Sequence, residues 1–177
     1  MKLRLERTLA GRILDIGGGG ECVMGRLYGA RVTAIDRSRE ELDEAPNVCE
    51  KRLMDAEELE FGDCSFESAT FFYTLMYMPR DTQARAIAEA ARVLKPGGRL
   101  AIWDCEIERA FPEPHLAELE LDIAGKRLNV TYGIIDPNAR QCADTFVQLC
   151  GALSLIELAR EQRGSHFALE FVKPGEQ

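Results

Sequence analysis

The chain has 177 residues, of which 46% are hydrophobic, and its formal net charge at pH 7 is −8. This length suits one domain over residues 1–177, and the apolar share is too high for a disordered chain. No apolar run approaches the ~20 residues of a membrane span, and residues 1–12 lack a secretory signal. The negative charge repels nucleic-acid backbones. We therefore expect a cytoplasmic protein that binds neither a membrane nor a nucleic acid.

The first half of the chain alternates short β-like runs with helical patterns. Strands are expected over 12–16, 31–38, 48–56 and 65–75, and short helices over 21–28 and 39–45. The clearest helix covers 81–94, where apolar residues recur at helical spacing. The sequence KPGG at 95–98 ends that helix, and a fifth strand follows over 99–104. Such alternation predicts an α/β fold with a mostly parallel sheet covered on both faces.

The second half has a different pattern. Apolar and polar residues alternate over 116–133 around Ala124-Gly125-Lys126, which predicts an inserted hairpin. Asp136-Pro137 predicts the start of a second helix. Segments 153–162 and 166–173 predict a closing antiparallel pair. The apolar face of the second helix would comprise Ala139, Cys142, Ala143, Phe146, Val147 and Cys150.

Six cysteines occur without any Cys-x-x-Cys pair. This spacing disfavours a structural zinc site. Without a secretion signal, free thiols are favoured over disulfides. We therefore expect no metal.

Four consecutive glycines, Gly17 to Gly20, follow the first strand directly. Ligands of parallel sheets bind at the carboxyl ends of the strands, so this position suits a binding loop. A glycine turn that leads into a helix presents free N–H groups to an anionic group such as a phosphate or carboxylate.

Two kinds of nucleotide loop fit poorly. The dinucleotide pattern G-x-G-x-x-G lacks its third glycine here, and no Gly-Lys-Ser/Thr follows as in a phosphate-binding P-loop. The pattern D-x-G-x-G at 15–19 places an acid before the glycines. That acid suits a zwitterionic ligand, whose ammonium it would help to receive.

The chain resembles the class I S-adenosylmethionine-dependent methyltransferases, particularly the "type 11" group. The matching pieces are ILDIGGGG, VTAIDRS, MDAEEL, SFESATFFYTLMYM and RVLKPGGRLAIWD, in the family's order over residues 12–104. The resemblance implies a Rossmann-like seven-stranded sheet flanked by helices, with an antiparallel C-terminal strand and a hairpin insertion after strand five. It implies S-adenosylmethionine as the cofactor and S-adenosylhomocysteine as the product.

The resemblance also implies roles for individual residues. Gly17, Gly18 and Gly19 would pass under the methionine part of the cofactor, and Asp15 would orient the loop and help to receive the ammonium. Asp36 would accept hydrogen bonds from the ribose hydroxyls. Arg37, Asp55 and Ala56 would contact the adenine, and the region of Phe72 would offer main-chain carbonyls at the end of strand four. Glu21 stands where the family has a further glycine.

The methyl acceptor would lie beyond strands four and five. Tyr73 and Tyr77 are the candidates to face the methyl group, although an aromatic residue there can equally be a wall. His115 is expected in a surface loop, and His166 on the final hairpin, away from the site. Few residues precede strand one, so we expect an open site or a lid from a partner subunit or from residues 105–135.

Several functions remain open from the sequence. The first is methyl transfer to a small molecule, for which a dedicated base is optional because the protein mainly supplies alignment. A catalytically silent cofactor-binding subunit, with a homodimer through the 116–133 hairpin, is the second. RNA or protein methylation is the third, and a nicotinamide oxidoreductase is the least favoured. The acceptor is not identified by the sequence.

Overall fold

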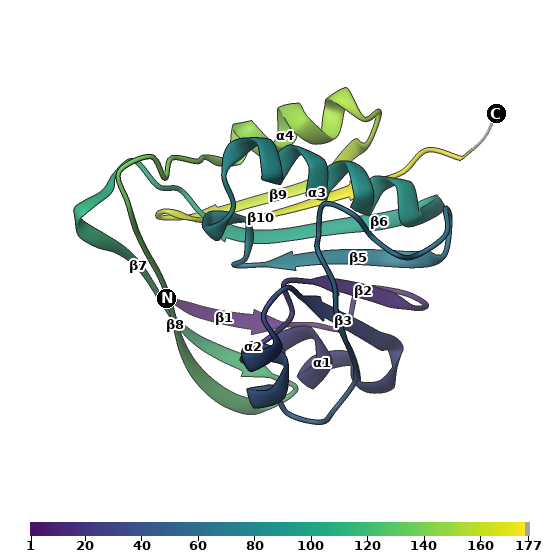
Figure 1. Ribbon diagram of the computed structural model, residues 1–177, viewed down its shortest axis with the longest axis horizontal. Coiled ribbons are helices and arrows are strands. Elements are labelled where there is room, and N and C mark those ends of the chain that lie inside the picture. The colour runs from purple at the N-terminus through teal and green to yellow at the C-terminus, as the bar shows by residue number, and fades with distance from the viewer. Residues whose placement is uncertain (176–177) are drawn as a thin grey trace.

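Ten strands, four α-helices and two short 3-10 helices make up residues 1–175, the part of the chain that the computed structural model describes (Figure 1). The first half contains β1 (Lys2–Leu5), β2 (Ile13–Ile16), α1 (Val23–Tyr28), η1 (Gly29–Arg31), β3 (Val32–Asp36), α2 (Arg39–Glu44), β4 (Glu50–Leu53), β5 (Phe66–Phe72) and η2 (Leu75–Tyr77). The second half contains α3 (Arg80–Val93), β6 (Leu94–Cys105), β7 (Ala110–Ile123), β8 (Lys126–Asp136), α4 (Ala143–Ala152), β9 (Ile156–Arg163) and β10 (His166–Val172).

The larger of two sheets has seven strands in the order β4-β3-β2-β5-β6-β10-β9. The strands from β4 to β6 are parallel, and β10 runs antiparallel between β6 and β9. All four residues of β2 are buried, as expected for a central parallel strand covered on both faces. The predicted α/β sheet and its antiparallel C-terminal strand are confirmed.

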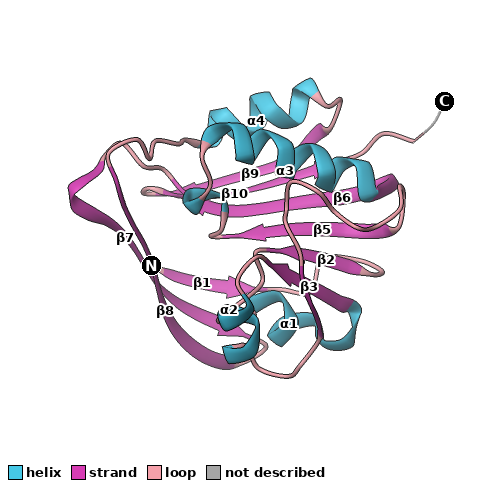
Figure 2. Ribbon diagram, viewed as in Figure 1, coloured by secondary structure: helices cyan, strands magenta, loops and turns pink. Residues whose placement is uncertain are grey.

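The two faces of this sheet are covered differently. Helices α3 and α4 lie on one face (Figure 2), where Ala86, Ile87 and Phe146 are fully buried. The other face is covered by α1 and by the second sheet, in the order β1-β7-β8. Alternate β7 residues, including Leu119 and Leu121, are buried in this second core. A β-sheet thus takes part of the surface that helices alone would cover in a simpler α/β fold.

The hairpin is longer than the 116–133 segment suggested by the sequence. It spans Ala110 to Asp136 and turns at Ala124 and Gly125, which have φ values of 52° and 83°. Strand β1 was not predicted at all. It pairs in parallel with β7, from Lys2 opposite Glu120 to Leu5 opposite Ile123.

The predicted start of the second helix is wrong. Asp136 ends β8, and its carboxylate accepts a hydrogen bond from the Asn138 N–H at 2.7 Å, which makes Asp136-Pro137 a turn. The helix begins at Ala143 instead. Of the face predicted for it, Ala143, Phe146 and Cys150 are buried, whereas Cys142 is exposed at the N-cap.

All six cysteines carry free thiols in this structure. Within residues 1–175, no helix combines the length and the apolar character needed to cross a membrane.

Candidate functional site

A cavity of about 680 Å³ opens at the carboxyl ends of the parallel strands. The loops that follow β2, β3, β4 and β5 line it, and β8 contributes Thr131 and Tyr132 from the second sheet. All nine residues that the sequence nominated for the cofactor line this one cavity, as do the two tyrosines favoured for the methyl acceptor: Asp15, Gly17, Gly18, Gly19, Asp36, Arg37, Asp55, Ala56, Phe72, Tyr73 and Tyr77.

The glycine loop is packed too closely for side chains. A Cβ on Gly17 would lie 1.9 Å from Oγ1 of Thr74, and Gly17 has a φ of +74° that favours glycine. A Cβ on Gly18 would lie 2.5 Å from the Asp15 carboxylate, and one on Gly19 would lie 2.8 Å from the Asp36 carboxylate. The loop therefore consists of backbone without side chains, packed closely against Asp15, Asp36 and Thr74.

The N–H groups of this loop are not free, contrary to the expectation from sequence. Gly17 and Gly18 both donate to the Ile35 carbonyl at 2.9 Å, and Gly20 donates to the Glu41 carbonyl at 2.9 Å. Gly19 donates to Oδ2 of Asp36 at 3.3 Å. These bonds fix the loop against β3 and α2, so the loop offers a ligand a rigid shape rather than a row of unpaired donors.

Asp15 and Asp36 anchor the loop from two strands. Asp15 is buried within β2, and the Thr70 hydroxyl donates to its Oδ1 at 2.7 Å. Burial raises the pKa of Asp15 to about 7, the Thr70 hydrogen bond opposes the rise, and the charge of Asp36 adds to it. Asp36 ends β3, and its Oδ1 accepts the Ser38 N–H at 2.9 Å. The Asp36 carboxylate is half-buried at the cavity wall and retains lone pairs for a ligand.

The cavity wall is strongly acidic. Seven carboxylate residues line it against two arginines, Arg26 and Arg37. The pKa of Glu41, which reaches the loop from α2, is raised by burial and by the neighbouring charges of Asp36 and Glu44. A site of this sign attracts a ligand with a net positive charge and repels a pyrophosphate.

The segment after β4 supplies the far wall. Asp55 is exposed, and its Oδ1 accepts the Glu57 N–H at 2.9 Å, so this aspartate also fixes its own loop. Arg37 is exposed at the cavity edge, and Ala56 and Phe72 are more enclosed. Glu41, which the sequence did not single out, presses against the glycine loop together with Thr74. Only the fold brings these two residues to the glycines.

Two tyrosines follow β5. Tyr73 has a φ of +50°, a strained conformation for a residue with a side chain. Its ring stacks on Tyr132 of β8, with centroids 5.1 Å apart and an interplanar angle of 10°. The hydroxyl of Tyr77 accepts the Gly133 N–H of β8 at 3.1 Å. Both tyrosines thereby link the cavity wall to the second sheet, which supports the part of the lid expectation that named residues 105–135.

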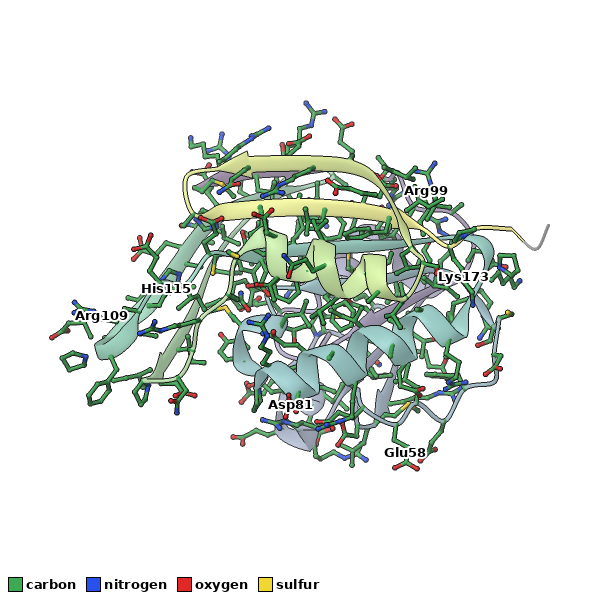
Figure 3. The ribbon with its side chains drawn as sticks, turned by 90° about the horizontal axis from the view of Figure 1, so that it is seen from above. Glu58, Asp81, Arg99, Arg109, His115 and Lys173 are labelled. Atoms are coloured by element: carbon green, nitrogen blue, oxygen red, sulfur yellow. The ribbon has the colours of Figure 1, made fainter. Side chains whose placement is uncertain are left out.

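The expected position of His115 is wrong, and that of His166 is right for the element but wrong for its distance from the site. His115 lies in β7, opposite Ile134, rather than in a surface loop (Figure 3). His166 lies on the final hairpin and does not line the cavity, but its Nδ1 is 2.8 Å from the hydroxyl of Tyr73, which does. An antiparallel strand begins where its parallel neighbours end, so the first residue of β10 meets Cys105, the last residue of β6.

Comparison with known protein families decides the relationship of the chain. A protein-family model for the methyltransferase domain matches residues 14–102. The chain belongs to this methyltransferase family. The matched segment of the methyltransferase domain runs from β2 to β6 and includes every loop that carries a nominated cofactor residue.

Curated relatives match over part of their own length. The methyltransferase domain is 30% identical to the O-methyltransferase resE of Aspergillus sclerotiorum, over 63% of this chain and 46% of that protein. It is 39% identical to the ubiquinone/menaquinone biosynthesis C-methyltransferase UbiE of Desulfotalea psychrophila, over 54% of this chain and 42% of that protein. The chain thus spans about half the length of these relatives.

The fold is shared with solved structures. A structure described as a SAM-dependent methyltransferase from Methanosarcina mazei superimposes with a TM-score of 0.67 at 22% identity, and 93% of each chain is covered. At that identity the likeness establishes the Rossmann-like methyltransferase fold of the domain.

Proposed function

We propose that this chain is an S-adenosylmethionine-dependent methyltransferase that acts on a small-molecule acceptor. The observation that carries the proposal is the single cavity in which all nine nominated cofactor residues meet. When bound, S-adenosylmethionine supplies an activated methyl group on a good leaving group. The protein supplies alignment and an enclosed site.

The residues fit the cofactor by shape. The bare backbone of Gly17, Gly18 and Gly19 passes under the methionine end, where a Cβ would collide with neighbouring side chains. Asp36 accepts the ribose hydroxyls through the lone pairs that Gly19 and Ser38 leave free. Arg37, Asp55 and Ala56 border the adenine.

The residues also fit the cofactor by charge. S-adenosylmethionine carries a sulfonium and an ammonium against one carboxylate, so it is cationic overall. The excess of carboxylates around the cavity, including Asp36 at the glycine loop, favours such a ligand. A dinucleotide, whose pyrophosphate is anionic, would meet repulsion at the same place.

Three tyrosines, Tyr73, Tyr77 and Tyr132, lie at the cavity wall on the side of the second sheet. Their rings suit a small organic acceptor. The net charge of −8 disfavours an RNA acceptor, and the names of the relatives include O- and C-methyltransferases.

Isothermal titration calorimetry with S-adenosylhomocysteine tests the cofactor assignment. The wild-type protein is expected to bind, and Asp36→Asn is expected to bind about tenfold or more weakly, because hydrogen bonds to charged groups contribute about 1.5–3 kcal/mol. Asp43→Asn on the exposed side of α2 is the matched control and should bind like the wild type. Absence of binding by the wild type, or equal affinity for all three proteins, refutes the assignment.

A further inference from the structure

The position of His166 follows from the topology. Because β10 runs antiparallel to β6, its first residue faces Cys105 at the carboxyl edge of the sheet. Phe167 next to it is buried between the sheet and α4. His166 is therefore held on strand β10 rather than on a loop. Its ring is half-buried, and the strand backbone fixes where the side chain starts.

The imidazole of His166 meets the cavity through Tyr73. The Tyr73 hydroxyl and the Nδ1 of His166 are 2.8 Å apart, and the ring centroids lie 5.9 Å apart. Tyr73 lines the cavity, and the Trp103 carbonyl accepts its backbone N–H at 2.8 Å. The strained φ of Tyr73 and its stacking on Tyr132 fix the direction of the hydroxyl. These contacts hold the almost fully buried Tyr73 side chain and the His166 ring in a defined geometry beside the cavity.

The surrounding groups favour a neutral pair. Burial, the Met1 ammonium and His115 lower the pKa of His166. Burial raises the pKa of Tyr73 above its usual value, and the neighbouring Asp104, Cys105 and Tyr132 raise it further. A neutral imidazole has one nitrogen that accepts a hydrogen bond. The Tyr73 hydroxyl can therefore donate to Nδ1 of His166, and its oxygen keeps lone pairs for a second donor.

We propose that Tyr73 and His166 form the proton-accepting pair for a phenolic hydroxyl acceptor. Tyr73 is the catalytic residue that contacts the acceptor oxygen, and His166 is the positioning residue that takes the proton. The aromatic wall of Phe72, Tyr73 and Tyr132 receives the ring of the acceptor. This inference rests on the proposed function.

The step balances as follows. The acceptor oxygen forms a bond to the methyl carbon, and the carbon–sulfur bond breaks with its electron pair passing to sulfur. The acceptor proton moves to the oxygen of Tyr73, whose own proton moves to Nδ1 of His166. The imidazolium then returns its proton to solvent, and the pair regains its neutral state.

The chain contains only two histidines, so NMR titration of the imidazoles reports the pair directly. His115→Gln assigns the signals. In the wild type we expect Nδ1 of His166 to be the unprotonated nitrogen and its pKa to lie below that of a free histidine. Tyr73→Phe removes the donor to neutral Nδ1 and should raise this pKa. Tyr132→Phe, which keeps the aromatic ring, is the control and should leave the His166 titration unchanged. An unchanged titration in Tyr73→Phe overturns the proposal.

Methyl transfer to chosen probes supplies the second readout. Phenol ionises near pH ~10, as tyrosine does, whereas 4-nitrophenol is largely ionised at mildly alkaline pH. His166→Gln should lower kcat for phenol by about 100-fold, the usual scale of general base catalysis, and should barely affect 4-nitrophenol. Equal loss on both probes would show that the pair only maintains the cavity shape. Turnover of aniline but of neither hydroxyl compound would also overturn the proposal.

The experiments test the cofactor assignment and the Tyr73–His166 pair separately. If the wild type does not bind S-adenosylhomocysteine, the proposed function itself is refuted. If it binds and the Tyr73→Phe titration is unchanged, only the pair is refuted. If none of the three probes is turned over, the titration alone decides.

Discussion

Gly17 is the residue at which backbone conformation and close packing coincide. Its φ of +74° costs a residue with a side chain about 1–2 kcal/mol, and its Cβ would lie 1.9 Å from the Thr74 hydroxyl oxygen. The close contact with Thr74 adds the cost of overpacking, about 1–3 kcal/mol. We therefore expect Gly17→Ala to lower the free energy of unfolding by about 3 kcal/mol, as measured by denaturant titration, and to weaken S-adenosylhomocysteine binding.

Gly125 in the hairpin turn is the control for Gly17. It has a φ of +83°, but no atom lies within 4 Å of a Cβ built there. Gly125→Ala should therefore cost only the backbone strain, about 1 kcal/mol, and leave binding unchanged. Equal losses for the two variants would mean that the contact with Thr74 is unimportant.

Asp104 predicts a pH dependence of stability. Its carboxylate lies within the core, where it accepts hydrogen bonds from the Met76 N–H, the Cys105 N–H and the Gln141 amide. Burial outweighs these donors and raises the pKa of Asp104 from 3.8 to about 7. The folded state thus binds more protons than the unfolded chain between these values, so the free energy of unfolding falls as pH rises from about 4 to about 7.

Asp104→Asn should remove this contribution to the slope. The wild type should lose up to ~1.4 kcal/mol per pH unit more than the variant over that range, in urea titrations at several pH values. The variant also places an amide N–H group near the Met76 N–H, but that cost shifts the whole curve and does not change its slope. Parallel curves for the two proteins would show that Asp104 does not change its protonation between about pH 4 and pH 7.

Single residues differ in how far the sequence predicts their position. Asp36 was predictable because it ends a strand beside the glycine loop, and strand ends of a parallel sheet share one edge. His166 was not, because its place depends on β10 entering the sheet next to β6 in the antiparallel direction. Nothing in the local sequence around His166 carries that information.

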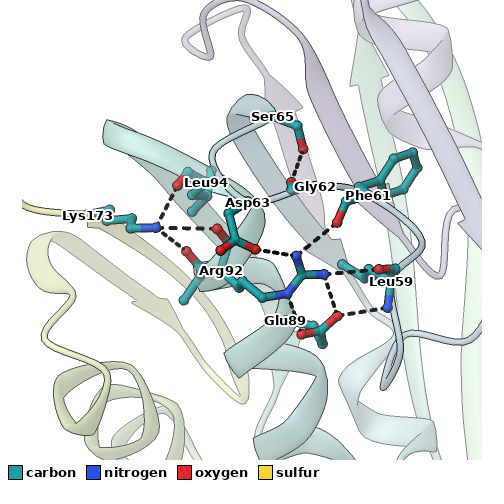
Figure 4. Close-up of polar contacts among 10 residues, drawn as sticks. Leu59, Phe61, Gly62, Asp63, Ser65, Glu89, Arg92, Leu94 and Lys173 are labelled. Atoms are coloured by element: carbon teal, nitrogen blue, oxygen red, sulfur yellow. Dashed lines mark hydrogen bonds and ion pairs between the residues drawn. The ribbon is translucent and has the colours of Figure 1, made fainter.

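At the scale of elements, Arg92 fastens the loop before β5 to α3 (Figure 4). Its guanidinium donates to the Phe61 and Leu59 carbonyls at 2.9 and 3.0 Å, and to the carboxylates of Asp63 and Glu89. The side chain is 32% exposed, so part of this charge interaction is screened. We expect Arg92→Ala to lower the free energy of unfolding by about 2 kcal/mol.

Arg85 on the same helix is the matched control for Arg92. It forms an ion pair with Glu57 at the surface, a class of interaction that solvent screens and that contributes little to stability. Arg85→Ala should therefore change the free energy of unfolding by less than half as much as Arg92→Ala. A similar loss in both variants would show that the carbonyl contacts of Arg92 contribute little.

Elements with strong periodicity were predicted well, and elements that depend on distant pairing were not. The 81–94 helix differs from α3 by one residue at each end. By contrast, Asp136-Pro137 carries the same signal for a turn and for a helix start, and the pairing of β8 with β7 selects the turn. The short strand β1 exists because β7 offers it a partner, 118 residues away at Lys2–Glu120.

At the scale of the whole molecule, the second sheet closes one side of the cavity. Tyr132 of β8 stacks on Tyr73, and the Tyr77 hydroxyl accepts the Gly133 N–H at 3.1 Å. These contacts join the hairpin to the seven-stranded sheet at the cavity. The glycine loop could be predicted from sequence because its parts are neighbours in the chain, whereas this closure joins segments more than fifty residues apart.

Tyr77→Phe tests whether the hairpin is held closed by this contact. The change removes one hydrogen bond, worth about 1 kcal/mol, and keeps the aromatic ring. We expect the Gly133 amide to exchange its hydrogen about fivefold faster, as measured by NMR, because local opening of β8 from the cavity becomes easier. Binding of S-adenosylhomocysteine should weaken by a similar or smaller factor, since the cavity loses part of its fixed wall.

Tyr28→Phe separates this local effect from a general loosening of the second sheet. The Tyr28 hydroxyl, on α1, accepts the N–H groups of Thr8 and Leu9 at 3.1 and 3.2 Å. Its removal should speed exchange at residues 8 and 9 and leave Gly133 unchanged. If Gly133 exchanges equally fast in both variants, the hairpin opens together with the N-terminal segment, and Tyr77 is not what holds it over the cavity.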